Sequence, residues 1–263
     1  MLYLVSIYKR RLLWRFYMIT CFVQLNLKLL FVLILLGFII GKSRHSAIQN
    51  FSNKKCGYFI MDFFNLIGIP VHELGHLLFG LFFGYHIDQV CLYRTTKKAI
   101  HSGGTLGFVK MHHENHSFLQ KLQGDLGQFF IGIGPLLFGP AVIYIISRFL
   151  PENIRTLPFS FQKGWAISLK ALQQLRASDI IFLFVFLYII MGISLNMELS
   201  RQDMHLACKG LILLEVIFLI LSGLSVLFHW NLQYSIDILF RWNLLIFSIG
   251  IISALIANLI SLI

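Results

Sequence analysis

Charged side chains are scarce in this sequence of 263 residues. Asp, Glu, Lys and Arg together make up 13% of the chain, against about 25% in an ordinary soluble domain. Hydrophobic residues make up 57%, and 26 residues are phenylalanine. A soluble domain of this length cannot bury so much apolar surface. The composition therefore excludes a disordered chain and a cytosolic enzyme, and it favours a polytopic membrane protein.

Acidic residues are fewer than basic ones, 11 against 22, so the formal net charge is +11. Such an excess can indicate nucleic-acid binding. Here, however, the Lys and Arg residues lie between apolar runs rather than in one stripe or tail, as the cationic flanks of membrane helices do. We therefore expect a lipid bilayer around the protein and no nucleic-acid partner.

Cysteine is also rare, and none of the four cysteines belongs to a Cys-x-x-Cys pair. Without such a pair, neither a zinc ribbon nor a thioredoxin-like redox site is expected. We expect free, mostly buried thiols at four positions: Cys21, Cys56, Cys91 and Cys208.

Six apolar segments approach the length of about 20 residues that crosses a bilayer as a helix. They cover residues 26–41, 58–84, 126–147, 179–196, 210–228 and 239 to the C-terminus. The sequence thus predicts an all-α polytopic membrane protein with about six transmembrane helices. The first segment follows the basic stretch KRRLLWR, as in a signal peptide, but no good small-residue cleavage site follows it. We therefore expect a retained helix.

The first 25 residues, ahead of this helix, are rich in basic side chains. They fit an amphipathic helix on the membrane surface and a disordered tail equally well. Basic residues divide almost equally between the two sides of a six-helix topology, so the positive-inside rule does not decide the orientation. Because the N-terminal basic cluster usually weighs most, we expect a multi-pass protein of the cell membrane with its N-terminus inside.

Two connections between apolar segments carry structural signals of their own. In the connection after the second segment, the stretches HIDQVCLYR and GTLGFVKMHH alternate partly between apolar and polar residues, around Ser102-Gly103-Gly104. This pattern predicts a β-hairpin or small sheet at the membrane surface. In the connection over residues 151–178 we expect a surface helix near the end.

The second apolar segment contains the motif His72-Glu73-Leu74-Gly75-His76. Helix positions four apart share a face, so His72 and His76 can bind one metal ion. Glu73 can then act as the general base toward a water molecule at that ion. Ionisable side chains are costly inside a membrane helix and mark function there by default. The alternative is a histidine pair that only hydrogen-bonds neighbouring helices.

A catalytic zinc ion usually has three protein ligands, so a third is expected farther along the chain. Asp203 is the best candidate, because Asn196 lies seven residues earlier, on the same face if one helix continues through both. His205 is a weaker rival for the position. Asp125 and Asp179 are expected to cap the helices that they open. Asp62 is expected to lie at the opposite depth of the membrane from His72.

Two further patterns accompany the motif. A second group of metal-binding residue types, His112, His113, Glu114 and His116, lies in a polar loop, and we interpret it as solvated rather than as a metal site. The segment 127–139, GQFFIGIGPLLFG, is rich in glycine. It can serve close helix packing or hold an extended substrate, and both roles stay open.

With these features the chain resembles the site-2 protease family of membrane-embedded zinc metalloproteases. The resemblance rests on HELGH at 72–76 in an apolar helix, on GIGPLLFG at 132–139, and on an Asp near a later membrane helix. At this last point the stretch SLNMELSRQD departs from the family's Asn-Pro-x-x-Asp-Gly form. The resembling core is residues 58–210, between a basic lead-in with the first helix (1–57) and two C-terminal helices (211–263).

The resemblance implies a three-helix catalytic core and a zinc metalloendopeptidase that cuts membrane-spanning or membrane-adjacent peptides. Carried over by position, the ligands of one Zn²⁺ would be His72, His76 and Asp203, and Glu73 would be the general base. A small secreted peptide is an alternative substrate. A non-catalytic membrane protein, such as an immunity factor or transporter accessory, is the alternative outside the enzymes, although such a protein is free to lose Glu73.

Overall fold

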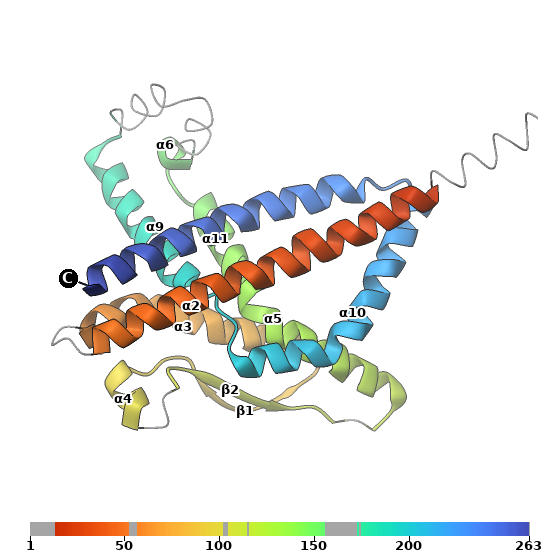
Figure 1. The fold of residues 1–263 in the computed structure, drawn as a ribbon, viewed down its shortest axis with the longest axis horizontal. Helices are drawn as coiled ribbons and strands as arrows, with labels where there is room; N and C mark the ends of the chain where they lie inside the picture. The colour runs from red at the N-terminus through yellow and green to blue at the C-terminus, as the bar shows by residue number, and fades with distance from the viewer. Residues whose placement is uncertain are drawn as a thin grey trace, which may run out of the picture.

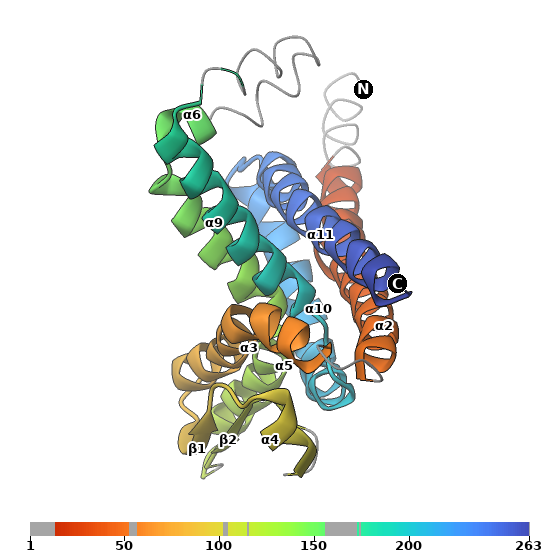
Figure 2. The same cartoon turned by 90° about the vertical axis from the view of Figure 1, so that its left-hand side faces the viewer.

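The computed structural model describes residues 14–52, 57–101, 105–114, 116–155, 173 and 175–262. Both views place a small sheet at one end of the molecule and the short helix α6 at the other (Figures 1 and 2). The elements in chain order are η1 (a π-helical stretch, Leu25–Phe31), α2 (Val32–Ser52), α3 (Gly57–Phe82), β1 (His86–Cys91), α4 (Thr96–His101), β2 (Phe108–His112), α5 (Phe118–Arg148), α6 (Glu152–Arg155), α9 (Ala177–Leu195), α10 (Arg201–Leu227) and α11 (Leu232–Leu262).

Six helices in the described residues are long and apolar enough to cross a membrane, which confirms the predicted fold class. They cover Trp14–Ser43, Gly57–Phe82, Phe118–Arg148, Ala177–Leu195, Arg201–Leu227 and Leu232–Ile256. Large apolar side chains on them, such as Phe184 and Ile212, are exposed. Such a surface is typical of helices that face lipid.

The first of these helices begins earlier than predicted. Residues 14–24 are already helical and continue into η1 and α2. This part of the basic lead-in therefore belongs to the membrane helix rather than to a surface helix or a tail. The reason is visible in its composition, because Arg15 is the only charged residue between Trp14 and Gln24. Residues 1–13 lie outside the described part of the chain.

The predicted hairpin is present after α3. β1 pairs antiparallel with β2, from His86 opposite His112 to Cys91 opposite Phe108. The sheet lies below α3 in Figure 1, and α4 occupies the connection between its strands. The hairpin therefore covers one side of the helix that carries the HELGH motif.

Asp62 of α3 anchors the connection between the two strands. Its carboxylate accepts hydrogen bonds from the backbone N (2.8 Å) and the hydroxyl (2.6 Å) of Thr96. Burial, together with the nearby carboxylate of Asp62, raises the pKa of the Tyr93 phenol in this connection to about 12. Asp62 precedes His72 by about 15 Å along the helix and has a structural role there.

Two acids expected to cap helices differ from the prediction in position. Asp179 does bond the start of α9, where its carboxylate accepts from the backbone N of Arg176 at 3.1 Å. It is the third helical residue, however, and Arg176 is the N-cap. Asp125 lies inside α5, which begins seven residues earlier with Ser117 as its N-cap. The surface helix expected near the end of 151–178 falls largely outside the described residues.

Close contacts between backbones bring α3, α5 and α10 together. A Cβ atom at Gly134 of α5 would lie 2.8 Å from the carbonyl oxygen of Gly75 in α3. A Cβ atom at Gly132 would lie 2.5 Å from the carbonyl oxygen of Asp203 in α10. Real Cβ atoms do not approach so closely, so only glycine fits at both positions. The glycine-rich segment therefore serves close helix packing, one of its two predicted roles.

The helices α9 and α10 follow one another along α5, in the opposite direction. Their successive contacts with α5 and the residues that follow it are Asp179 with Asn153, Ile193 with Gly139, Asp203 with Gly132 and Gly210 with Asp125. Between them the helix is interrupted, because α9 ends at Leu195 and α10 begins at Arg201. The condition under which Asn196 and Asp203 would share one helical face is therefore not met, because no single helix runs through both.

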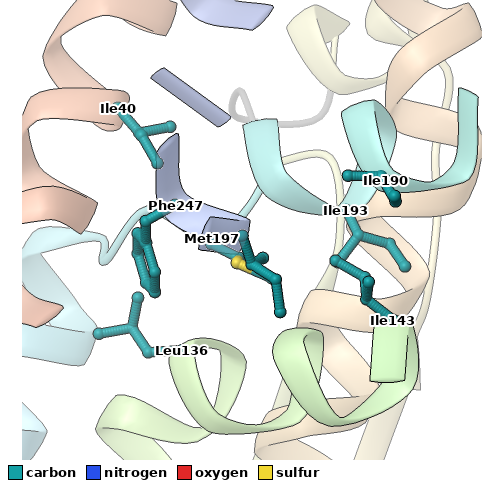
Figure 3. Close-up of a cluster of buried hydrophobic side chains, with 8 residues drawn as sticks. Ile40, Leu136, Ile143, Ile190, Ile193, Met197 and Phe247 are labelled. Atoms are coloured by element: carbon teal, nitrogen blue, oxygen red, sulfur yellow. The ribbon is translucent and has the colours of Figure 1, made fainter. Parts of the chain in front are cut away.

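The main apolar core lies where the first helix meets α5, α9 and α11 (Figure 3). Ile40, Leu136, Ile193, Met197 and Phe247 pack there, and none is more than 2% exposed. Met197 comes from the interruption between α9 and α10. The core therefore fixes the position of the segment that leads to Asp203.

The cysteines differ in burial more than predicted. Cys21 is buried, Cys91 is partly buried and Cys208 is exposed, and all three are free thiols. The prediction of free thiols holds for these three, and the prediction of burial holds fully only for Cys21. Cys56 lies outside the described residues.

Candidate metal centre

The three predicted metal ligands lie together. His72 and His76 occupy successive turns of α3, and their Nε2 atoms are 3.1 Å apart. Asp203, near the start of α10, faces both rings, with Oδ1 3.4 Å from Nε2 of His76 and Oδ2 3.8 Å from Nε2 of His72. Asp203 and His76 are buried, and one ligand atom from each of the three residues lies within 4.8 Å of the others.

The outer nitrogen of each ring is hydrogen-bonded to a main-chain carbonyl. Nδ1 of His72 lies 2.7 Å from the oxygen of Asn196, and Nδ1 of His76 lies 2.7 Å from the oxygen of Ile131. A carbonyl oxygen only accepts, so each Nδ1 carries the proton and each Nε2 of the neutral rings is left with a lone pair. The main chain therefore sets both rings in the tautomer that binds a metal through Nε2.

The inward-facing atoms form a site for a cation. Two lone pairs and a carboxylate at these distances repel one another unless a proton or a metal ion lies between them. Zinc–nitrogen bonds of about 2.0–2.1 Å place tetrahedral ligand atoms about 3.3–3.4 Å apart. The two nitrogens, 3.1 Å apart, and the 3.4 Å from Nε2 of His76 to Oδ1 of Asp203 are close to that value, and Nε2 of His72 lies 3.8 Å from the other oxygen, Oδ2. The group therefore fits a metal ion, and two imidazoles with one carboxylate suit zinc.

Ser200 holds Asp203 in place through a capping box at the start of α10. The backbone N of Ser200 donates to Oδ2 of Asp203 at 2.9 Å, and the backbone N of Asp203 donates to the Ser200 hydroxyl at 3.1 Å. Sequence reasoning missed this residue, although Ser-x-x-Asp ahead of an apolar run is a capping signal.

His205, the rival third ligand, is exposed on α10. It does not belong to the group of His72, His76 and Asp203 that could hold a metal ion, which we call the metal-binding group. Two residues along a helix turn a side chain by about 200°. Since Asp203 faces the histidines, His205 points away from them.

The second group of histidines begins at His112, the last residue of β2, and forms separate pairs. His112 contacts Asp88 at 2.8 Å, and His116 contacts Glu114 at 3.0 Å, where the hydrogen bond lowers the pKa of the Glu114 carboxyl. All four side chains are well exposed. In the parts of the chain that the structure describes, only His72, His76 and Asp203 form a group of three that could hold a metal.

Glu73 is buried beside the metal-binding group and in contact with the hairpin. Its side chain is 7% exposed. A Cβ atom at Gly107, just before β2, would lie 2.7 Å from Cγ and 2.9 Å from Oε1 of Glu73. Only glycine lets the hairpin approach this carboxylate so closely. Sequence reasoning missed Gly107, and its one signal is a glycine directly before a strand.

A cavity of about 1380 Å³ opens between the helices and the hairpin. Its walls include His72, Glu73 and His76 from α3, Asp203 from α10 and Lys110 from β2. Pockets for small molecules usually measure about 300–1,000 Å³. This cavity is therefore large enough for several residues of a peptide, with the metal-binding group in its wall.

Comparisons of the chain with models of protein families, with curated proteins and with solved structures gave no match. The resemblance to the site-2 protease family therefore continues to rest on the sequence motifs. The functional inference depends on the residues of the site itself.

Proposed function

We propose that the protein is a membrane-embedded zinc metalloendopeptidase of the site-2 protease type. One observation carries the proposal. Nε2 of His72, Nε2 of His76 and the carboxylate of Asp203 converge beside Glu73 in the wall of one cavity. A metal site with a purely structural role is closed by four protein ligands. Three ligands with a carboxylate next to them favour catalysis instead.

The metal ligands and Glu73 have different roles in peptide hydrolysis. A zinc ion bound by His72, His76 and Asp203 would polarise the scissile carbonyl and supply hydroxide at neutral pH. Glu73 accepts the proton of the attacking water and later donates it to the leaving amine. Its burial removes competing water and keeps the carboxylate in one position.

The surroundings of the cavity favour a peptide substrate from the membrane or its surface. The cavity lies between apolar helices on one side and a polar hairpin on the other. A membrane-spanning helix must unwind before it is cut, because its peptide groups are otherwise hydrogen-bonded within the helix. The polar hairpin can bind an unwound segment of the substrate beside the metal-binding group. A small secreted peptide fits the same cavity.

The test uses protein purified in detergent and reconstituted into liposomes. We expect wild type to bind about one zinc per chain and to cut members of a library of single-span peptides, detected by mass spectrometry. Glu73→Gln should keep the zinc and lose about 10²–10⁴-fold in rate, the usual contribution of a general base. Chelation should abolish cleavage, and added zinc should restore it.

Two results contradict the proposal. One is a zinc-loaded wild type that cuts no member of the library, which moves the protein to the non-catalytic class. The other is cleavage that persists at the wild-type rate in Glu73→Gln, which assigns the activity to a contaminant or to another site.

A further inference from the structure

Three charged side chains lie inside α10, beyond its first residue: Asp203, Lys209 and Glu215. Charged groups in a membrane helix are costly, and they pair with one another or mark a substrate or ion pathway. Asp203 belongs to the metal-binding group, and Glu215 accepts a hydrogen bond from Asn26 of the first helix at 3.1 Å. Lys209 has no such partner, since its ammonium group forms no ion pair or hydrogen bond within the part of the chain that the structure describes.

Lys209 faces the cavity of the metal-binding group. Gln202, Leu206 and Lys209 are spaced four and three residues apart, so they lie on one side of α10, and all three line the cavity. The Lys209 side chain is also exposed, so a ligand in the cavity can reach it. A cation in a cleft with apolar walls attracts anions more strongly than one on an open surface.

Besides the two carboxylates at the metal-binding group, three carboxylates of the protein line the cavity: Asp88, Asp125 and Glu198. Asp88 is paired with His112 at 2.8 Å. Glu198 lies against the first helix, where a Cβ atom at Gly41 would be 2.9 Å from its Oε2. These two acids therefore contact groups other than Lys209.

Asp125 of α5 is the protein carboxylate that could compete for Lys209. The two helices touch at this level, because a Cβ atom at Gly210, the residue after Lys209, would overlap the carbonyl oxygen of Asp125. The side chains of Asp125 and Lys209 nevertheless form no ion pair. The anion that Lys209 attracts can therefore come from a ligand in the cavity, and Asp125 is the group to test against it.

The place of Lys209 limits where such an anion lies along a substrate. Lys209 follows Asp203 by six residues, about 9 Å of helix rise. Helical side chains lean toward the helix N-terminus, which here is toward Asp203. An extended peptide advances about 3.3 Å per residue. An anion bound at Lys209 is therefore within about three residues of a peptide bond held at the metal-binding group.

We propose that Lys209 is a specificity residue whose ammonium group binds a carboxylate of the substrate. The protein then prefers peptides that carry a negative charge within about three residues of the bond that is cut. The carboxylate is that of an Asp or Glu side chain or that of a peptide C-terminus. The inference rests on the proposed function and adds a substrate class to it, since segments that are apolar throughout are not preferred.

The first test compares matched peptides in liposomes. One Glu is placed in turn at each position near the bond that wild type cuts, with Gln there as the neutral form. At one position kcat/KM of wild type should be about tenfold higher for Glu than for Gln. Lys209→Met should cut both forms equally. Lys121→Met is the matched control, because Lys121 is exposed on α5 outside the cavity, and it should keep the preference.

Charge reversal separates a direct contact from a structural effect. Lys209→Glu should prefer Lys over Gln at the same peptide position, which loss of a purely structural role does not produce. Zinc content and melting temperature, measured alongside, should match wild type. Peptides that end near the cut bond, as a free acid or as an amide, identify the source of the carboxylate. A Lys209-dependent preference for the free acid alone assigns the site to C-termini, and one for internal Glu assigns it to side chains.

Three outcomes overturn the role of Lys209 while leaving the proposed function intact. One is a wild type that prefers a carboxylate of neither source. Another is a preference that survives in Lys209→Met. The third is a preference that returns when Asp125→Asn is added to Lys209→Met, which would mean that Lys209 only neutralises Asp125. If wild type cuts no peptide, the proposed function fails, and this inference fails with it.

Discussion

Hydrogen bonds with the main chain orient single residues of the site. Each histidine ring is held at Nδ1 by a carbonyl from another segment, and Asp203 is held by the backbone N of Ser200. Such contacts fix the tautomer and direction of a ligand, and their loss typically weakens metal binding by about 10–100-fold. The metal affinity of the site should therefore depend on residues that do not themselves bind the metal.

Replacing Asp203 tests the predicted ligand set. Asp203→Ala should lose most of its zinc, because it removes one of three ligands and leaves two histidines. His205→Ala is the matched control, since this side chain is exposed on the same helix, and it should keep about one zinc per chain. Metal analysis of both purified proteins is the measurement. Full zinc content in Asp203→Ala would remove Asp203 from the site.

Replacing Ser200 tests the support of that ligand. Ser200→Ala removes the side-chain cap of α10, which should cost about 1 kcal/mol of stability and weaken zinc binding about tenfold. Competition with a zinc chelator measures the affinity. Ser248→Ala is the control, because its hydroxyl bonds only within its own exposed helix turn. Equal zinc affinities for the two variants would show that the capping box does not hold Asp203.

At the scale of whole elements, the helices α3 and α5 meet at glycines, and this contact sets the distance between them. Gly134→Ala would place a methyl group against the backbone of Gly75, and the helices would have to separate. We expect a loss of about 1–3 kcal/mol, the usual cost of overpacking, together with weaker zinc binding.

The control for this substitution is Gly223→Ala. A Cβ atom at Gly223 would have no neighbour within 4 Å, so stability should be unchanged or slightly higher. Thermal unfolding in detergent compares the two variants. If they unfold at the same temperature, the close approach of α3 and α5 does not matter for the fold.

The elements predictable from the sequence are those with a local signal. Long apolar runs gave the membrane helices, and four-residue spacing put His72 and His76 on one face. The prediction of Asp203 was based partly on an uninterrupted helix from Asn196, and the structure has a break there instead. The local sequence does not indicate which main-chain carbonyl will accept a hydrogen bond from each histidine ring. The carbonyls of Asn196 and Ile131 that do so belong to segments distant in sequence from the histidines. Gly107 was missed for the same reason.

At the scale of the whole molecule, the first helix and α11 run side by side in the same direction (Figure 1). Their successive contacts are Tyr17 with Trp230, Lys28 with Asp237, Gly37 with Phe247 and Ile40 with Gly250. If both cross the bilayer, both begin on the same side, which requires an odd number of crossings in all. Because α9 and α10 follow one another along α5, we infer that these two helices share one crossing.

This packing predicts that Trp14 and Ile256 lie on opposite sides of the membrane. Six separate crossings would put them on the same side. Topology reporters fused before Trp14 and after Ile256 distinguish the two cases, and a reporter in the connection between α3 and α5 should match the one before Trp14. Reporters at the two ends that agree with each other would contradict the parallel arrangement of the first helix and α11.

The central claim is that two histidines and an aspartate bind a zinc ion inside a membrane protein. X-ray absorption at the zinc edge of the purified wild type tests it most directly. The structure predicts about one zinc per chain with nitrogen and oxygen neighbours at about 2.0–2.1 Å and the outer scattering of two imidazoles. Protein that stays free of metal after incubation with zinc, or a zinc signal without imidazole scattering, would contradict the claim.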